Sequence, residues 1–522
     1  PIPPLVEPLA PGTIARVESP PTVQMLVPGF TVRELPVKLS NINNVLYRDD
    51  GKLVALGYDG NIHLLTDTDG DGLEDKDELF WENKGQLIAP IGMALTPPGY
   101  EHGRGVAVAA KRKCALIVDT DGDDRADKEI VAASGWPQRP HPVDALGVAF
   151  DPRDHAIFFG IGTPLFTDPY VLKGTDHASY QLDGERGTIM RIAPDLKSRK
   201  IIATGIRFPV SIRFNAAGDL FCTDQEGATW LANGNPFDEL LHIEQGRHYG
   251  FPPRHPRYLP NVIDEPSVFD YRPQHQSTCG LNFNEPTHDG SIFGPKWWRS
   301  DAFVTGDSRG KLYRTKLMNT ASGYVAQNQL LATLTMLPTD ACVAPDGSLV
   351  VAVHSGGPDW GSGPSGVGKL FKVTRLGSEA PVPSLVWANG PQEVRIAFDR
   401  PIDSYNLKGL ASRIAIEGGE FVAAGDRLET VRPGYAAVEH QQNAPRFPVD
   451  IEAIQLASDG RTLILSTSPQ LAAVNYAIAM RDVRPSNAAH AGACEVPQLP
   501  DIDLQYDLTG VEATWAPPTG EK

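Results

Sequence analysis

The sequence predicts an all-β protein: a six-bladed β-propeller followed by a small β-sandwich domain of the immunoglobulin-like (Ig-like) type. Three observations predict this fold class. Helical periodicity is almost absent, one hairpin pattern recurs six times, and the composition changes after Arg375. With 522 residues, the chain exceeds the roughly 250–300 residues at which a single hydrophobic core stops growing. A propeller accommodates this length because each blade adds its own layer to a ring.

Each predicted blade contains a short run of alternating apolar residues, a tight turn and a second such run. Asp-Gly or an equivalent pair supplies the positive φ angle that a tight hairpin needs. Two unrelated β-sandwiches would not explain why the same hairpin recurs at about the length of a blade with its loops. The six units are Val45–Ala55, Ile91–Thr96 with the strand after Gly105, Leu146–Gly160, Val210–Cys222, Gly280–Phe283 with Ala302–Arg314, and Thr339–Val353.

The same patterns predict the domain boundaries. Residues 30–375 form the propeller, and residues 1–29 form an extended N-terminal segment. The stretch LGSEAPVPS, residues 376–384, is a Pro-containing linker. Beyond it, short alternating runs such as VRIAFDRPID and RTLILSTSP predict the sandwich over residues 385–490. Residues 491–522 form an irregular, Pro-rich tail.

Composition and charge exclude several classes of protein. The formal net charge of −17 argues against a nucleic acid partner, because phosphate binding needs a basic surface. The five cysteines are far apart, without CxxC or CxxCH, which excludes zinc ribbons, thioredoxin-like chemistry and covalently attached c-type haem. The sequence contains no run of about 18 apolar residues, and so it predicts no membrane-spanning helix. Because the first residue is Pro1 rather than Met, we expect a periplasmic or secreted protein whose export signal has been removed.

The sharpest local motif is DTDGDGLEDKDE, which begins at Asp67. Acidic residues occupy positions 1, 3, 5, 9 and 12 of this EF-hand-like loop, and Gly72 at position 6 permits the sharp reversal. Oxygen ligands at alternate positions can surround one Ca²⁺ ion. The predicted ligands are Asp67, Asp69, Asp71, the carbonyl of Leu73, Asp75 and Glu78.

A second copy, DTDGDDRADK, begins at Asp119. Asp124 replaces the glycine and Ile130 occupies position 12, so this copy should bind calcium more weakly. Both loops follow apolar runs that predict strands, which indicates that calcium stabilises the blades and does not act as a switch. The predicted ligands are Asp119, Asp121, Asp123, Arg125 at the carbonyl position, and Asp127.

Two further segments carry a family resemblance. They are HPVDALGVAFDPRDHAIFFGIGT, beginning at His141, and residues 205–252, which contain GIRFPVSIRFNAAGDLFCTDQEG and FDELLHIEQGRHYGFP. Both resemble the glucose/sorbosone dehydrogenase family, and the chain looks most similar to its membrane-bound dehydrogenase branch from planctomycete-like bacteria, without the c-type haem motif. Soluble members are six-bladed propellers that bind pyrroloquinoline quinone (PQQ) and calcium and oxidise aldoses. The resemblance therefore implies a sugar dehydrogenase with Ca²⁺ and PQQ.

The resemblance also implies roles for individual residues. His141 matches the general base that takes a proton as hydride leaves the sugar, and Asp144 could orient it. Arg207 matches an arginine that holds the quinone. Gln225 and Gly227 match the turn near the cofactor calcium, and Asp238 and Glu239 follow that turn in the family pattern.

The chain departs from the family pattern at several positions that contact the quinone. Arg309, within GDSRG, stands where the family has its cofactor lysine, and Phe208 replaces an asparagine. The paired arginines expected near Asp340 are replaced by LPTD, which leaves Asp340 as the candidate at that strand end. Arg309 and Asp340 complete the predicted cofactor-binding set.

Three functions remain open at this point. The first is a quinone-dependent oxidoreductase acting on a sugar or related alcohol, with a separate redox protein as a partner. The second is a non-redox lyase or hydrolase that uses carboxylates such as Asp224, Glu226 and Asp340 as acid and base. The third is a catalytically silent binding or assembly module whose C-terminal domain docks a partner. Fold alone does not decide among them, because propellers host many chemistries.

Overall fold

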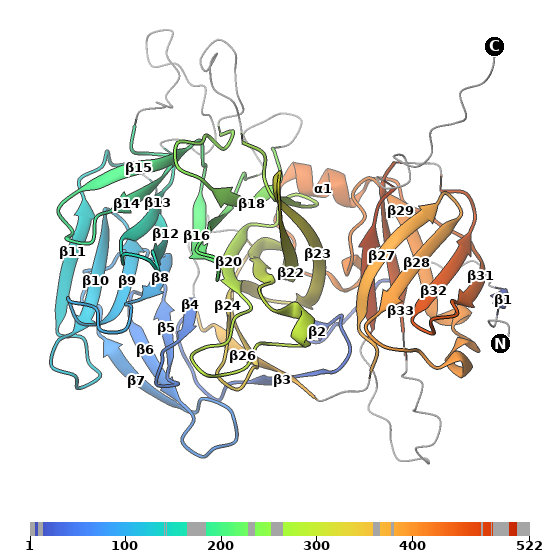
Figure 1. The fold of residues 1–522 in the computed structure, drawn as a ribbon, viewed down its shortest axis with the longest axis horizontal. Coiled ribbons are helices and arrows are strands. Elements are labelled where there is room, and N and C mark those ends of the chain that lie inside the picture. The colour runs from blue at the N-terminus through green and yellow to red at the C-terminus, as the bar shows by residue number, and fades with distance from the viewer. Residues whose placement is uncertain are drawn as a thin grey trace, which may run out of the picture.

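The computed structural model describes residues 6–8, 14–139, 141, 143–163, 184–227, 235–251, 265–358, 366–376, 380–470, 473–481, 483 and 501–508. Six antiparallel sheets form a ring, and two more sheets lie beside it at the C-terminal end of the chain (Figure 1). The predicted fold class, a six-bladed propeller with a second β domain, is confirmed. No helix within the described ranges is both long enough and apolar enough to cross a membrane.

The first four blades are built from consecutive strands, innermost strand first. Blade 1 contains β4 (Ile42–Tyr47), β5 (Leu53–Gly57), β6 (Ile62–Thr66) and β7 (Lys76–Trp81). Blade 2 contains β8 (Gly92–Leu95), β9 (Arg104–Ala110), β10 (Lys113–Asp119) and β11 (Lys128–Ser134). Blade 3 contains β12 (Ala145–Phe150), β13 (Ile157–Ile161), β14 (Thr188–Ile192) and β15 (Arg199–Thr204). Blade 4 contains β16 (Pro209–Phe214), β17 (Leu220–Asp224), β18 (Asp238–Ile243) and β19 (Phe269–Tyr271).

The last two blades each take a strand from the N-terminal end of the chain. Blade 5 contains β20 (Thr278–Phe283), β21 (Ala302–Gly306), β22 (Lys311–Thr320) and β23 (Gly323–Leu334), with β2 (Val23–Met25) at its outer edge. Blade 6 contains β24 (Leu337–Val343), β25 (Leu349–His354) and β26 (Lys369–Arg375), and β3 (Phe30–Glu34) pairs antiparallel with β26. This pairing closes the ring. Two short 3-10 helices, η1 (Lys296–Trp298) and η2 (Asp307–Arg309), flank β21.

The C-terminal domain is a sandwich of two antiparallel sheets. Its core joins apolar side chains from both sheets, such as Ile396 and Leu465 of one and Ile416 and Ile478 of the other. One sheet contains β27 (Pro383–Gly390), β28 (Glu393–Phe398), β31 (Ile451–Leu456), β32 (Thr462–Thr467) and β1 (Val6–Pro8). The other contains β29 (Ile414–Gly419), β30 (Phe447–Pro448), β33 (Asn475–Met480) and β34 (Ile502–Tyr506). The connections carry α1 (Ala436–Gln442) and the 3-10 helices η4 (Ser404–Leu407), η5 (Ala411–Arg413) and η6 (Asp426–Leu428).

The domain boundaries differ from the predicted ones in three places. β1 lies within the expected extended segment but pairs with β31, and β34 lies within the expected irregular tail but pairs with β33. β27 begins at Pro383, inside the expected linker. β1 has only three residues, too few to show an alternating pattern, and β34 follows a Pro-rich stretch that hid it.

The inner strands of the blades are buried on both faces because each blade packs between two neighbours. β5, β13, β24 and β25 are buried at every residue. Glycines let neighbouring blades approach closely at two of these contacts. A Cβ on Gly147 would lie 2.7 Å from the backbone nitrogen of Ile212, and one on Gly280 would lie 2.5 Å from Oδ1 of Asp340. Larger residues at these positions would force the blades apart.

Asp340 connects three blades around the centre of the ring. From β24 it accepts hydrogen bonds from the N–H of Val45 in blade 1 (3.1 Å) and from the amide of Asn282 in blade 5 (3.2 Å). It also accepts from the N–H of Ala341 (3.0 Å). Burial raises the pKa of Asp340 to about 6, although the positive charge of Arg213 opposes that shift. Asp340 therefore serves the assembly of the ring, which differs from its predicted cofactor role.

We expect Asp340→Ala to lower the free energy of unfolding by about 2–4 kcal/mol, because buried donors on two other blades lose their acceptor. Urea denaturation followed by tryptophan fluorescence measures this change. Asp289→Ala is the control, because the Asp289 side chain is 97% exposed. Equal unfolding midpoints for the two variants would show that Asp340 does not hold the ring together.

Candidate functional site

The candidate site lies where the innermost strands of the six blades face the central channel. Each of these strands, β4, β8, β12, β16, β20 and β24, contacts the innermost strand of the next blade. They surround a small cavity, with room for little more than a water molecule. Polar and small residues make up most of its lining, which consists of Asn43, Asn44, Ile91, Val210, Ser211, Cys279, Gly280 and Thr339.

The turn after β17 fixes Arg207, which precedes β16. The carboxylate of Asp224 accepts the N–H of Arg207 at 2.9 Å and the N–H of Phe208 at 2.6 Å. Nη1 of Arg207 donates to the carbonyl of Gln225 at 2.6 Å. Gly227 has a φ of +73°, and a Cβ there would lie 2.5 Å from Nη2 of Arg207. The structure thus brings together Arg207, Gln225 and Gly227, three of the predicted cofactor-binding residues.

Three carboxylates gather beside Arg207. One oxygen from each of Asp224, Glu226 and Glu239 lies within 4.8 Å of the others. Burial raises the pKa of Asp224 to about 7. Burial, followed by the charge of Asp224, raises the pKa of Glu226 well above its ordinary value, and burial followed by Glu226 does the same for Glu239. A hard cation such as Ca²⁺ is the species that such oxygens bind in place of protons.

The neighbouring Asp238 has a supporting role. Its carboxylate accepts the N–H of Glu226 at 2.8 Å and the N–H of Ser277 at 2.6 Å. His275 lies beside it, with Nδ1 3.8 Å from Oδ2 of Asp238. The ring of Tyr435, from the C-terminal domain, meets the His275 ring edge-on at 5.7 Å between centroids. The second domain therefore reaches this end of the propeller, which the sequence did not predict.

His141 lies next to the Arg207 segment. Its ring meets the ring of Phe208 edge-on at 6.5 Å between centroids, and Nδ1 lies 3.2 Å from the carbonyl of Val143 and 3.1 Å from its N–H. In the tautomer that donates from Nδ1 to this carbonyl, Nε2 is the proton acceptor. Burial, together with the positive charge of Arg139, lowers the pKa of His141 to about 4. The imidazole is therefore neutral at physiological pH, which is the form a proton acceptor must have.

Asp144 serves a different purpose from the predicted one of orienting His141. It is buried and accepts hydrogen bonds from Nε1 of Trp136 (2.7 Å), the N–H of Arg112 (3.1 Å) and Nη2 of Arg186 (2.6 Å). These contacts occupy both carboxylate oxygens. Asp144 therefore anchors the wall of the site behind His141.

Arg309 lies at the boundary between the two domains. Its guanidinium makes two hydrogen bonds to Glu429 of the C-terminal domain, at 2.9 and 2.7 Å, and a third to the carbonyl of Gln274 at 2.6 Å. It is 3% exposed. The predicted cofactor role of Arg309 is thus replaced by an ion pair between domains.

Sequence analysis missed two arginines near His141. Arg139 donates from Nη1 to the carbonyl of Thr163, and Arg186 donates from Nε to the carbonyl of Pro137 at 2.6 Å. Burial, followed by the charge of Arg186, lowers the pKa of Arg139 to about 9. The closeness of Arg139 to His141 in the sequence was the one available signal. Arg186 reaches the site only through folding, because it lies on the connection before β14.

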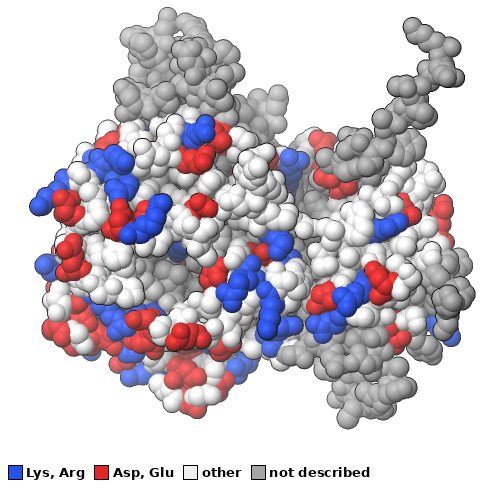
Figure 2. All heavy atoms as spheres, viewed as in Figure 1, with Lys and Arg blue, Asp and Glu red and all other residues white. Residues whose placement is uncertain are grey.

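The first predicted calcium loop joins β6 to β7. One carboxylate oxygen from each of Asp67, Asp69 and Asp71 lies within 4.8 Å of the others. Asp67 accepts the N–H groups of Gly70 (2.8 Å) and Gly72 (2.9 Å), and these hydrogen bonds lower its pKa. Acidic side chains gather at the lower edge of Figure 2, where Figure 1 places this loop.

The other predicted ligands of this loop have different environments. Asp75 accepts the N–H of Thr68 at 2.8 Å and its hydroxyl at 2.7 Å, which closes the loop from within. Leu73 donates its N–H to a loop aspartate at 2.7 Å. Glu78, the expected twelfth-position ligand, lies in β7 with its carboxylate 3.1 Å from Lys76, outside the group of three aspartates. A strand follows this loop where an EF-hand has a helix, so the twelfth position is placed differently.

The second loop joins β10 to β11 at the equivalent place in blade 2. Carboxylate oxygens of Asp119, Asp121 and Asp127 lie within 4.8 Å of one another, whereas Asp123 does not join the group. The hydroxyl of Thr120 donates to Asp127 at 2.7 Å. The negative charge of Asp123 raises the pKa of Asp121, so a cation here would relieve repulsion.

Asp124 explains why this loop lacks the glycine of the first. Its φ of +67° keeps the left-handed backbone that glycine would supply. Its carboxylate lies 2.7 Å from Arg48 and 2.5 Å from Lys52, both in blade 1. Arg125, the predicted carbonyl ligand, donates its N–H to Asp123 at 2.8 Å. Asp124 thus ties the second loop to the preceding blade.

The sequence matches the model of one protein family, described as a domain of unknown function (DUF7133), over residues 47–353. This is more than half of the 522 residues. The chain belongs to this family. No curated protein matches the sequence.

The propeller resembles solved structures of sugar dehydrogenases. The PQQ domain of pyranose dehydrogenase from Coprinopsis cinerea is 13% identical, with a TM-score of 0.51, 68% of this chain covered and 98% of that one. The soluble aldose sugar dehydrogenase of Escherichia coli is 15% identical, with a TM-score of 0.47 and coverage of 66% and 99%. A Trichoderma reesei carbohydrate-active enzyme of family AA12, solved with calcium, is 12% identical, with a TM-score of 0.46 and coverage of 69% and 99%. At 13% identity, the first of these likenesses supports the fold alone.

We expect calcium to stabilise the protein through the two Asp loops, by about 2.7 kcal/mol for each loop at a hundredfold excess over its dissociation constant. Asp67→Ala and Asp119→Ala should each remove one binding event in isothermal titration calorimetry. Asp195→Ala is the matched control, because Asp195 lies in the equivalent β14–β15 connection of blade 3 without neighbouring aspartates. Unchanged stoichiometry in both loop variants would contradict the assignment.

Proposed function

We propose that the chain is a calcium-dependent dehydrogenase that oxidises an aldose or related sugar with PQQ. One observation carries the proposal. At one end of the channel, Arg207 is fixed against the carboxylates of Asp224, Glu226 and Glu239, and the neutral imidazole of His141 lies beside it. A cation site, a cationic side chain and a proton acceptor thus share one region of the molecule.

The residues present fit both groups in charge and donor type. The three carboxylates Asp224, Glu226 and Glu239 would hold the calcium ion, because hard cations take carboxylate oxygens. Arg207 and Arg139 would bind the carboxylates of PQQ, since a guanidinium presents a planar fork of donors. Their burial strengthens such an interaction, because the surrounding dielectric is low.

The chain's own residues would then orient the sugar and remove its proton. PQQ, when bound, would supply the oxidising power for the removal of a hydride, that is, two electrons and one proton, from C1. His141 would accept the proton of the C1 hydroxyl, so that the sugar leaves as a lactone and the electrons balance. The positive charges of Arg139 and Arg207 would stabilise the negative charge that develops on the sugar oxygen.

A second candidate is a non-redox hydrolase or lyase. The pKa of Asp224, raised to about 7, and those of Glu226 and Glu239, raised further, favour it, since a protonated carboxyl can act as a general acid. Asp340 is not available for this chemistry, because its carboxylate holds the blades together. Titration of the protein with PQQ separates the dehydrogenase from the hydrolase or lyase, because only the dehydrogenase needs to bind PQQ.

We further propose that the protein works in the periplasm or outside the cell, and that a separate redox protein takes the electrons. Exposed acidic loops bind calcium at the higher concentrations found outside cells. The sequence contains no CxxCH motif, so a haem that accepts the electrons would lie outside these 522 residues. The C-terminal domain, which approaches the site through Tyr435, would be the docking face.

We expect calcium-loaded protein to bind PQQ and to reduce a dye when an aldose is added. His141→Ala should keep PQQ binding and lower kcat by about 10²–10⁴-fold, because the proton acceptor is lost. Arg207→Gln should weaken PQQ binding itself in calorimetry. His288→Ala is the control, because the His288 side chain is 64% exposed. The absence of PQQ binding by folded, calcium-loaded protein would overturn the dehydrogenase proposal.

The pH dependence of kcat/KM tests the role of His141 separately. Because its pKa is lowered to about 4, the imidazole stays neutral from pH 7 down to about pH 5, and the rate should fall only as the pH drops through about 4. Removing the positive charge in Arg139→Gln should raise that pKa and move the acidic limb to higher pH. An acidic limb that is the same in Arg139→Gln and the wild type would contradict this assignment.

A further inference from the structure

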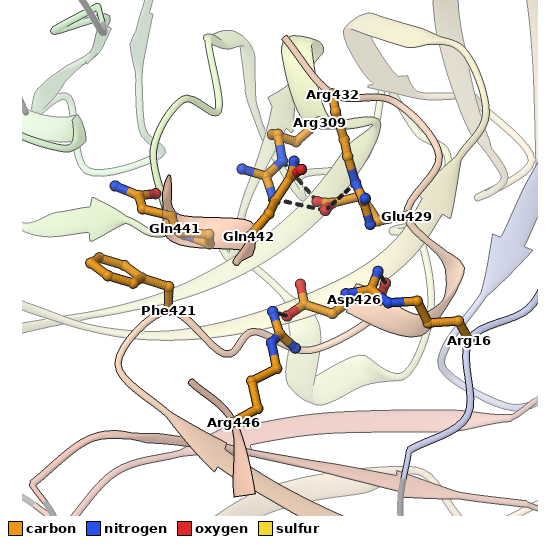
Figure 3. A pocket seen from close by; sticks show the side chains of 10 residues that line it. Arg16, Arg309, Phe421, Asp426, Glu429, Arg432, Gln441, Gln442 and Arg446 are labelled. Atoms are coloured by element: carbon orange, nitrogen blue, oxygen red, sulfur yellow. Dashed lines mark hydrogen bonds and ion pairs between the residues drawn. The ribbon is translucent and has the colours of Figure 1, made fainter. Parts of the chain in front are cut away.

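A small recess, open to solvent, lies between blade 5 and the C-terminal domain (Figure 3). It is distinct from the candidate active site and lies outside the part of the chain that the family model matches, except at Pro273 and Arg309. Charged side chains from both domains line it. They are Arg16, Arg309, Arg432, Arg446, Asp426 and Glu429.

Glu429 is surrounded by more positive charge than it can balance. Arg309 pairs with it at 2.7 Å, Lys311 lies 3.5 Å away and Arg432 lies 3.6 Å away. Burial alone would raise the pKa of Glu429, but Arg309 and Lys311 outweigh burial and lower the pKa to about 2. The carboxylate is therefore ionised, and a single negative charge faces three positive ones.

The second carboxylate of the recess does not balance this excess. Asp426 lies 2.8 Å from Nη2 of Arg446, and the same oxygen accepts the N–H of Ala423 at 2.9 Å. Arg16 reaches only the backbone carbonyl of Asp426, at 3.5 Å. Four arginines and two carboxylates thus line the recess, and Glu417 lies 3.1 Å from Nη1 of Arg446, so one positive charge remains in excess.

Two donors and two acceptors at the recess have no hydrogen-bond partner within the described part of the chain. The donors are Nε of Arg432 and Nε2 of Gln442, and the acceptors are Oδ1 of Asp426 and Oε1 of Gln441. Figure 3 shows Gln442 and Arg432 extending toward the Arg309–Glu429 pair from opposite sides. Buried donors are nearly always paired in folded proteins, because an unpaired one costs about 1–3 kcal/mol. Water could accept these hydrogen bonds, but it would leave the charge unbalanced.

We propose that the recess binds a small tetrahedral oxyanion, sulfate or phosphate. Such an anion offsets the excess positive charge and accepts hydrogen bonds from Arg432 and Gln442. Guanidinium groups are the side chains best suited to it, since their planar forks match its oxygens. Because Arg309 comes from the propeller and Arg432 and Arg446 from the C-terminal domain, the anion links the two domains.

Thermal unfolding of the full chain in sulfate, phosphate or chloride at equal ionic strength tests the proposal. Sulfate or phosphate should raise Tm by about 2–4 °C relative to chloride. Isothermal titration calorimetry with sodium sulfate and sodium phosphate should show one site, and the comparison identifies which oxyanion binds more tightly. Equal Tm values in all three salts would overturn the proposal.

Two variants test whether the oxyanion binds in this recess. Arg432→Gln should weaken oxyanion binding at least about tenfold, because it removes both a charge and a donor. Gln442→Ala removes a donor but no charge, so it should weaken binding less and serves as the second test if Arg432→Gln does not fold. The matched control is Arg395→Gln, since Arg395 is similarly exposed and pairs with one glutamate in the same domain. Equal oxyanion effects in Arg432→Gln, Gln442→Ala and Arg395→Gln would place the anion elsewhere and overturn the proposal.

Discussion

The closure of the ring by β3 and β26 is the constraint on which the rest of the structure depends. These strands are separated by more than 330 residues of sequence, yet they pair in register from Phe371 opposite Glu34 to Arg375 opposite Phe30. Closure fixes the angle between blades, and so it places the innermost strands around one channel. Asp340 reinforces the closure at the centre, because it joins blade 6 to blades 5 and 1. The residues of the candidate site come from different blades and meet only because this ring is closed.

Buried charge is arranged differently in the candidate site and at the domain boundary. In the candidate site, negative charge from Asp224, Glu226 and Glu239 is in excess beside one fixed arginine. At the domain boundary, positive charge is in excess around Glu429. Isolated charges in a low-dielectric interior are costly, so either a counter-ion or, at the carboxylates, a bound proton offsets each excess. The two regions are connected through the segment Gln274–His275, which contacts Arg309 on one side and Asp238 on the other.

Local patterns predicted most of the fold. The six hairpins follow from period-two alternation and turn residues, which depend on neighbours in sequence. The strands that the sequence hid are β1 and β34, which are short and are stabilised by partners far along the chain. The site was predicted only in part, for a similar reason. His141, Arg207, Gln225 and Gly227 lie in recognisable local motifs. Asp144 instead pairs with Arg186, and Arg309 pairs with Glu429. No local sequence pattern reveals such pairings.

The path of the first 34 residues has a consequence for how the molecule is made. β1 completes a sheet of the C-terminal domain, β2 extends blade 5 and β3 closes blade 6. During synthesis these strands leave the ribosome before their partners β31, β23 and β26, so their edges stay unpaired until those strands emerge. The two domains are therefore not separable parts joined by a linker. A chain cut between them would leave each half without a strand or an ion-pair partner that the other supplies.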